Sequence, residues 1–131
     1  MIHLKNIIFV GLGGFVGSIL RYLMTNWIIQ ISGVKLFPIG TSFVNILGCL
    51  MIGILGGWYE HMQFFTPHIR LFLMVGLLGG FTTFSSFGYE TMNLVRDKEL
   101  LLAFTNFAVQ IIIGFSSVLI GIRISALIAN H

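Results

Sequence analysis

The chain has 131 residues, of which 56% are hydrophobic and 8% charged, with a net charge of +3 and a mean hydropathy of +1.00. Soluble domains carry about 25% charged residues, so this composition excludes a soluble domain and predicts a multi-pass protein of the cell membrane. The isoelectric point of 9.4 comes from only seven basic residues. They form no cluster dense enough for nucleic acid and are typical of loops near anionic lipid.

Four apolar segments are long enough to cross a bilayer. A helix needs about 20 residues to do so, and such segments are expected at roughly 6–31, 38–59, 69–95 and 100–128. Little chain is left for anything beyond one four-helix transmembrane domain over residues 1–131. The first segment begins like a signal peptide, but Arg21 interrupts its apolar run and no small-residue cleavage site follows. We therefore expect it to remain as the first transmembrane helix.

The basic residues are divided evenly between the two ends of the predicted helices. The groups are Lys5, Arg70 and Arg123 at the end that carries the N-terminus, and Lys35, Arg96 and Lys98 at the other end. An excess of Lys and Arg on one side is what sets the orientation of a membrane protein. The balance predicts a chain that inserts in both orientations and pairs as an antiparallel homodimer. The alternative is that so small a count is a coincidence.

Small residues, the cysteine and the histidines have structural interpretations. The pairs Gly13/Gly17 and Gly53/Gly57 are spaced for close contact between helices. Cys49 is the only cysteine, so one chain offers no disulfide, and we expect a small packing residue. The histidines lie at ends and loops without the spacing of metal ligands, and we expect them to be solvated. They are His3, His61, His68 and His131.

Polar side chains inside the predicted spans are candidate functional groups. Arg21 lies near mid-depth in the first span, where an arginine marks an ion or substrate path unless it snorkels to the interface. Asn45, one turn after Thr41 in the second span, is either a donor to an ion or one side of an interhelical hydrogen bond. Glu90 is either an intramembrane carboxylate or a group at headgroup level.

The fourth span carries a polar ridge. Asn106 and Gln110 are four residues apart and therefore lie on one helix face, with Ser116 and Ser117 further along. A ridge of this kind fits either packing between helices or the wall of a pore.

The third span contains the sequence Gly-Gly-Phe-Thr-Thr-Phe-Ser-Ser-Phe at residues 79–87. Glycines and hydroxyls predict a break there, and unpaired backbone groups in hydrocarbon cost several kcal/mol unless they are buried in protein or line a polar path. Phe81, Phe84 and Phe87 recur at every third position and are expected to form one stripe. Aromatic ring edges carry partial positive charge, which suits a small, strongly hydrated anion. The alternative is a packing face whose hydroxyls bond back to the helix.

Three motifs in register resemble the Fluc (CrcB) family of small fluoride channels, and the likeness covers essentially the whole chain. They are Gly13-Gly14-x-x-Gly17-x-x-x-Arg21, Gly40-Thr41-x-x-Val44-Asn45 and the segment 79–87. The resemblance implies an all-α antiparallel, dual-topology homodimer with two fluoride pores and passive export of fluoride. It also implies a central structural sodium ion, held by the backbone carbonyls of Gly79 and Thr82 from both subunits.

The resemblance further implies pore roles for individual residues. Phe84 and Phe87 would present ring edges, Asn45 would donate hydrogen bonds and Arg21 would supply positive potential. The remaining expected pore residues are Thr83, Ser85, Ser86, Asn106 and Gln110. Gln110 departs from the family pattern, which often has a serine there.

Two other functions compete with a fluoride channel, and neither is enzymatic. A small proton-coupled multidrug exporter also uses four spans and dual-topology dimers. Such an exporter needs a deep titratable carboxylate, expected in the first span, whereas Glu90 in the third span is the only intramembrane candidate here. The third possibility is an assembly subunit that transports nothing.

Overall fold

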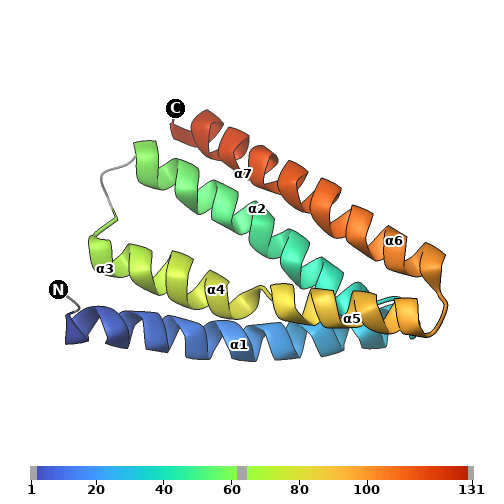
Figure 1. Cartoon of the computed structure of the whole chain (residues 1–131). Helices are drawn as coiled ribbons and strands as arrows, with labels where there is room; N and C mark the ends of the chain where they lie inside the picture. The colour runs from blue at the N-terminus through green and yellow to red at the C-terminus, as the bar shows by residue number, and fades with distance from the viewer. Residues whose placement is uncertain (1–2, 62–64, 130–131) are drawn as a thin grey trace.

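The computed structural model describes residues 3–61 and 65–129 and is helical along nearly all of them (Figure 1). The first half consists of α1 (Leu4–Ser32) and α2 (Ile39–His61). The second half is α3 (Pro67–Arg70), η1 (Leu71–Leu77), α4 (Leu78–Phe81), α5 (Phe84–Arg96), α6 (Leu100–Ala108), η2 (Val109–Ile113) and α7 (Gly114–Ala129). Four described stretches are long and apolar enough to cross a membrane: Leu4–Ser32, Ile39–Glu60, Pro67–Arg96 and Leu100–Ala129. The predicted all-α architecture with four spans is confirmed.

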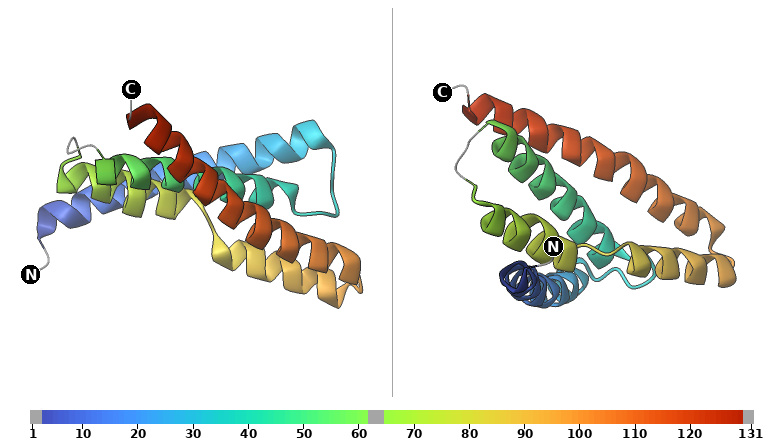
Figure 2. Two further views of the ribbon diagram at one scale, coloured as in Figure 1. Left: turned by 90° about the horizontal axis from the view of Figure 1, so that it is seen from above. Right: turned by 60° about the vertical axis from the view of Figure 1, so that its left-hand side comes forward.

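Helix α2 is the centre of the molecule. It contacts α1, α4, α5, η2 and α7. In Figure 1 it runs obliquely between a lower layer, formed by α1 with α3 and α4, and an upper rod formed by α6 and α7. Figure 2 (left) shows that α5 leaves the line of α3 and α4 and lies beside α6. The third span is therefore split between two neighbours, α1 before its break and α6 after it.

Glycines allow the backbone of α1 to touch the first half of the third span. A Cβ atom at Gly17 would overlap the carbonyl oxygen of Leu77, and one at Gly13 would overlap that of Phe72. Small residues let membrane helices approach to backbone contact, where dispersion forces replace the missing hydrophobic drive. The first predicted glycine pair therefore locks α1 against η1 and α4.

The second predicted pair joins α2 to α7 in the same way. A Cβ at Gly53 would overlap the carbonyl oxygen of Val118, and one at Gly57 would overlap the hydroxyl of Ser125. Ser125 is fully buried and its hydroxyl donates to the Ile122 carbonyl at 2.8 Å. Both glycine pairs make the predicted close helix contacts, but they do so inside one chain and so carry no information about a dimer.

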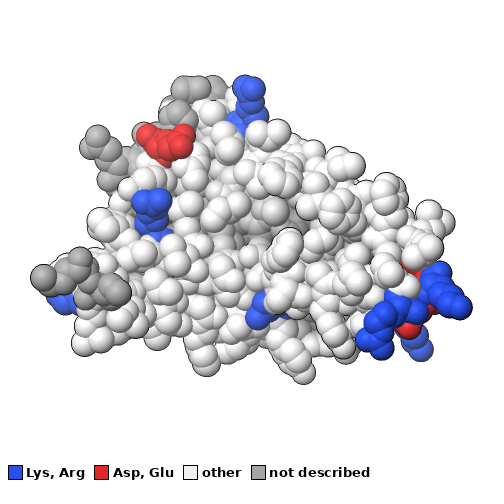
Figure 3. Space-filling view, in the orientation of Figure 1, with Lys and Arg blue, Asp and Glu red and all other residues white. Residues whose placement is uncertain are grey.

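The surface is apolar around its middle and charged at its ends. Large side chains such as Phe15 and Leu101, 66% and 77% exposed, face outward. Figure 3 shows most Lys, Arg, Asp and Glu toward the two ends of the molecule, with a largely uncharged surface between them that a basic side chain interrupts near the middle. Such a surface suits lipid around the middle and water or headgroups at both ends.

The break in the third span is only two residues long. Helix α4 ends at Phe81, Thr82 (φ −85°, ψ 158°) and Thr83 (φ −151°, ψ 112°) are extended, and α5 starts at Phe84. The predicted break is thus confirmed, but the predicted single stripe of phenylalanines is wrong. Phe81 is buried beside Gly48 of α2, whereas Phe84 is 79% exposed. Two extended residues reset the helical register, so side chains before and after them no longer share a face.

One of the histidines also differs from expectation. His3 is exposed, as predicted, but His68 is half-buried and its ring stacks on Phe9 of α1 with a centroid distance of 5.0 Å. Thr66 caps α3 by accepting from the Ile69 amide at 3.3 Å, which begins the helix early enough to turn His68 toward α1. The side chain of His61 and the whole of His131 lie outside the described parts of the structure.

The glycine contact of α1 can be tested by adding one methyl group. Gly17→Ala should lower the free energy of unfolding by about 1–3 kcal/mol, because overpacking forces the backbones apart. Gly11→Ala is the matched control on the same helix, since nothing lies within 4 Å of a Cβ there. The measurement is the melting temperature of the detergent-solubilised protein. Equal melting temperatures for the two variants would contradict the close approach of α1 to Leu77.

Candidate functional site

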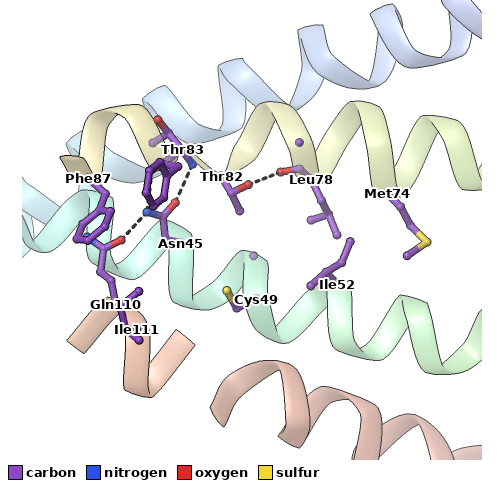
Figure 4. Close-up of a pocket in the computed structure, with 13 residues that line it drawn as sticks. Asn45, Cys49, Ile52, Met74, Leu78, Thr82, Thr83, Phe87, Gln110 and Ile111 are labelled. Atoms are coloured by element: carbon purple, nitrogen blue, oxygen red, sulfur yellow. Dashed lines mark hydrogen bonds between the residues drawn. The ribbon is translucent and has the colours of Figure 1, made fainter. Parts of the chain in front are cut away.

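A cavity of about 340 Å³ lies against the break in the third span. Figure 4 shows it between α2, the two halves of the third span and the fourth span. Most of its wall is apolar, and its polar groups come from Asn45, Thr82, Thr83 and Gln110. Its lining includes seven residues singled out from the sequence: Asn45, Gly79, Thr82, Thr83, Phe84, Phe87 and Gln110. Three others, Arg21, Ser85 and Ser86, are not among the lining residues, and neither is Asn106.

Asn45 satisfies both backbone groups of the residue at the break. Its Oδ1 accepts from the Thr83 amide at 2.8 Å, and its Nδ2 donates to the Thr83 carbonyl at 3.0 Å (Figure 4). In a helix the Thr83 amide would donate to the carbonyl of Gly79. The side chain of Asn45 therefore replaces the helix bond that the Thr83 amide loses at the break, and it adds a bond to the Thr83 carbonyl, which as the N-cap of α5 also accepts the first bond of that helix. The interhelical role considered for Asn45 is observed, and a role as an ion donor stays a prediction.

A chain of side-chain amides, half-buried at Asn45 and Gln110 and buried at Asn106, continues from Asn45 into the fourth span. Asn45 Nδ2 donates to Gln110 Oε1 at 2.6 Å, and Gln110 Nε2 donates to Asn106 Oδ1 at 3.1 Å. Asn106 is fully buried and its Nδ2 donates to the Thr91 hydroxyl at 2.8 Å. Ser42 also donates to Asn106 Oδ1 at 3.1 Å. The chain joins α2, α5 and the fourth span, because each buried amide needs several partners.

The four hydroxyls of the motif do different things. Thr83 Oγ1 caps α5 by accepting from the Ser86 amide at 3.1 Å, and it lies 3.0 Å from Ser86 Oγ and 3.2 Å from Ser85 Oγ. Thr82 Oγ1 instead bonds back to the Leu78 carbonyl at 2.9 Å. A helix N-terminus carries partial positive charge. The cap therefore leaves three hydroxyls clustered at an end of α5 that favours negative charge.

The aromatic pair of the cavity has edge-to-face geometry. The rings of Phe84 and Phe87 lie 5.5 Å apart at 64°, which directs the positive edge of one ring at the other. Phe87 is buried and its ring lies 6.3 Å from that of Phe107 on α6. Phe84 remains mostly uncovered by its own chain. The cavity is therefore open on the side where Phe84 stands.

Arg21 reaches the break from α1 rather than snorkelling to the interface. The side chain is half-buried and its Nη1 donates to the carbonyl oxygen of Thr82 at 3.4 Å. The break frees that carbonyl, because the Ser86 amide that would bond it in a helix goes to Thr83 Oγ1. A permanent positive charge is thus held beside the extended residues.

Glu90 bonds to α2 close to the start of that helix, so its level in the membrane stays a prediction. Its Oε1 accepts from the hydroxyl of Thr41 at 2.7 Å, and the side chain is half-buried. Ser116 and Ser117 bond to the carbonyls of Ile112 and Ile113 in their own helix. The polar ridge of the fourth span is therefore split. Gln110 lines the cavity, Asn106 is buried behind it, and the two serines bond back to the helix.

Sequence reasoning missed three participants. Ser42 and Thr91 complete the hydrogen bonds of Asn106, and Cys49 lines the cavity instead of being an enclosed packing residue. Two of them could have been found from their spacing on α2. Ser42 precedes Asn45 by three residues and Cys49 follows Asn45 by four, so Ser42 and Cys49 lie on the same side of α2 as Asn45. Thr91 gives no such signal, because its partner Asn106 is on another helix.

A family comparison decides the relationship of this chain to known proteins. The model of the family described as "CrcB-like protein, Camphor Resistance (CrcB)" matches residues 8–122. The chain belongs to the CrcB family. It is a multi-pass membrane protein, in agreement with the four apolar spans of the structure.

Curated relatives align with nearly the whole chain. The "Fluoride-specific ion channel FluC" of Flavobacterium psychrophilum is 37% identical over 125 residues, which cover 93% of this chain and 98% of that protein. The protein of the same name from Shewanella loihica is 40% identical over 118 residues, covering 90% and 94%. "Fluoride-specific ion channel FluC 3" of Methanosarcina barkeri is 36% identical over 125 residues, covering 95% and 93%. The resemblance inferred from the three motifs is confirmed.

The role of Asn45 at the break can be tested by removing its amide. Asn45→Leu should lower the free energy of unfolding by about 1–3 kcal/mol, because the buried amide of Thr83 loses its partner. The local measurement is hydrogen exchange at the Thr83 amide, which should become much faster. Asn26→Leu is the matched control, since Asn26 is exposed on α1 and bonds only to the Tyr22 carbonyl. Unchanged protection of the Thr83 amide would refute the role of Asn45.

Proposed function

We propose that this protein is a fluoride-specific ion channel through which fluoride leaves the cell passively, without proton coupling or ATP. The observation that carries the proposal is the match, over at least 90% of the chain, to relatives that bear this name. The cavity supports it, because it combines aromatic edges and amide groups at the break of a membrane helix. An inside-negative potential, worth about 2.3 kcal/mol per charge per 100 mV, drives an anion outward.

The proposed pore uses several weak positive groups in place of the water shell of fluoride. Phe84 and Phe87 present ring edges, and Asn45 offers an amide donor. Thr83, Ser85 and Ser86 add hydroxyls at the N-terminus of α5, where the helix dipole favours an anion. Arg21, held at the Thr82 carbonyl, contributes positive potential from behind the break. A low-dielectric surrounding strengthens each of these interactions relative to water.

The functional unit in this proposal is an antiparallel homodimer with two pores. Phe84 lines the cavity and yet is 79% exposed in the single chain, and in this proposal a second copy covers it and closes the wall. The even division of basic residues between the two ends of the spans is compatible with insertion in both orientations. Figure 3 illustrates that most of the charge lies toward both ends of the molecule.

A structural sodium ion fits the carbonyl groups at the break. The Gly79 carbonyl loses its helix partner to Asn45, and the Thr82 carbonyl binds Arg21 at 3.4 Å and has a second lone pair. Hard cations prefer oxygen ligands of this kind. One chain supplies two such carbonyls, and the same pair from a second copy would complete the ligand set. When bound, the ion would hold the two breaks together and would not be transported.

The aromatic pair gives a direct test of the pore. Phe84→Ile should abolish fluoride efflux from loaded liposomes in the presence of valinomycin, because the ring edge that faces the anion is lost. The dimer should persist on size-exclusion chromatography. Phe15→Ile is the matched control, since Phe15 is similarly exposed but lies on α1. Undiminished efflux through the Phe84 variant would refute the role of this ring. Proton-linked drug uptake by the unmodified protein would instead support the exporter.

The orientation of the chain can be tested separately. In a Cys49→Ala background, a cysteine added after the C-terminus should react with membrane-impermeant reagents on both sides of the membrane. The even charge distribution leads to equal labelling, because neither end is retained preferentially. Labelling from one side alone would exclude dual topology. The proposed fluoride conduction would remain to be judged by the efflux experiment.

A further inference from the structure

The chain of side-chain amides from Asn45 through Gln110 to Asn106 runs in one direction, and the backbone fixes that direction at both ends. At one end the amide of Thr83 can only donate and its carbonyl can only accept, so Oδ1 and Nδ2 of Asn45 have one possible assignment. At the other end the Thr91 hydroxyl donates to the Phe87 carbonyl at 2.8 Å and so accepts from Asn106.

This direction determines which atom of Gln110 faces Asn45. Because Asn45 presents Nδ2, Gln110 must present its carbonyl oxygen, Oε1, at 2.6 Å. Gln110 Nε2 then points the other way, to Asn106 Oδ1 at 3.1 Å and Ser42 Oγ at 3.4 Å. The break in the third span thus sets, through Asn45, the orientation of a glutamine on a different helix.

The oxygen of Gln110 stands where an anion would bind. Gln110 and Asn45 line the cavity together with Phe84 and Phe87, and Figure 4 shows the two amides joined at one end of the group of lining residues. The Asn45 Nδ2 group has two hydrogens, and they are directed to the Thr83 carbonyl and to Gln110 Oε1. The first bond supports the break, so an anion at this donor must replace the second.

We propose that the side chain of Gln110 is a displaceable gate in the ion path. Its Oε1 occupies the acceptor position on Asn45 Nδ2, and fluoride takes that position when Gln110 turns away. The inference rests on the proposed function, since it assigns a gate to the fluoride path. Turning away costs Gln110 two bonds from Nε2, one of 3.1 Å to Asn106 Oδ1 and a long one of 3.4 Å to Ser42 Oγ, while Ser42 Oγ stays 3.1 Å from Asn106 Oδ1. The gate makes Gln110 a determinant of apparent affinity.

Replacing the amide without changing the volume much tests this competition. Gln110→Met removes the acceptor from Asn45, so the fluoride concentration that gives half-maximal efflux should fall about 3- to 10-fold, the factor expected for one neutral hydrogen bond. Gln30→Met is the matched control, because Gln30 is exposed on α1, and it should leave this concentration unchanged. An unchanged or higher value for Gln110→Met would overturn the gate. If the unmodified protein carries no fluoride, the proposed function itself fails.

A second measurement follows the gate in the unmodified protein, with variants used only to assign its resonances. In isotope-labelled protein in lipid nanodiscs, adding fluoride should shift the side-chain amide resonances of Asn45 and Gln110 with the same concentration dependence. The resonance of Gln30 should not move. If the Gln110 amide does not respond to fluoride, the displacement is excluded whatever the effect of Gln110→Met on efflux. Assignment uses the loss of one side-chain amide signal in Gln110→Met and in Gln30→Met.

Discussion

The pairing of Asn45 with the Thr83 peptide is the interaction on which the rest of the structure depends. The break leaves the Thr83 amide without its helix acceptor, and an unpaired amide costs several kcal/mol in hydrocarbon. One asparagine on α2 supplies both the acceptor and the donor. Only with that pairing can α5 start again in a new register, with Phe84 and Phe87 at the cavity.

The two halves of the third span are held by different physical means. Before the break, η1 and α4 pack on α1 through glycines that permit backbone contact. After the break, α5 packs on α6 and is joined to α2 by side-chain hydrogen bonds through Asn45 and Asn106. Dense packing keeps the first half in place, whereas hydrogen bonds between side chains hold the second half. The site therefore lies at the boundary between a close-packed half and a hydrogen-bonded half.

Much of this arrangement can be predicted from the sequence. The features that cannot be predicted depend on local geometry that leaves no pattern in the sequence. Hydropathy and motif spacing gave the four spans, the broken third helix and the amide ridge on the fourth. They did not predict that a break of only two residues would place Phe81 and Phe84 on different faces. Nor did they give the stacking of His68 on Phe9, because a contact between two helices leaves no periodic signal in either one. The wide π-helical turns η1 and η2 also have no evident sequence marker.

The position of Gln110 shows how one residue changes a site without changing the fold. A serine there would be too short to hold both Asn45 and Asn106, which Gln110 contacts at 2.6 and 3.1 Å. Gln110 lies in η2, where the wider turn of a π-helix shifts the register of the side chains that follow. The longer side chain therefore bonds to Asn45 and Asn106 at once, whereas a shorter one would leave the Asn45 amide exposed to the cavity. The length of the single side chain opposite Asn45 can then set how accessible the Asn45 donor is, without any change of fold.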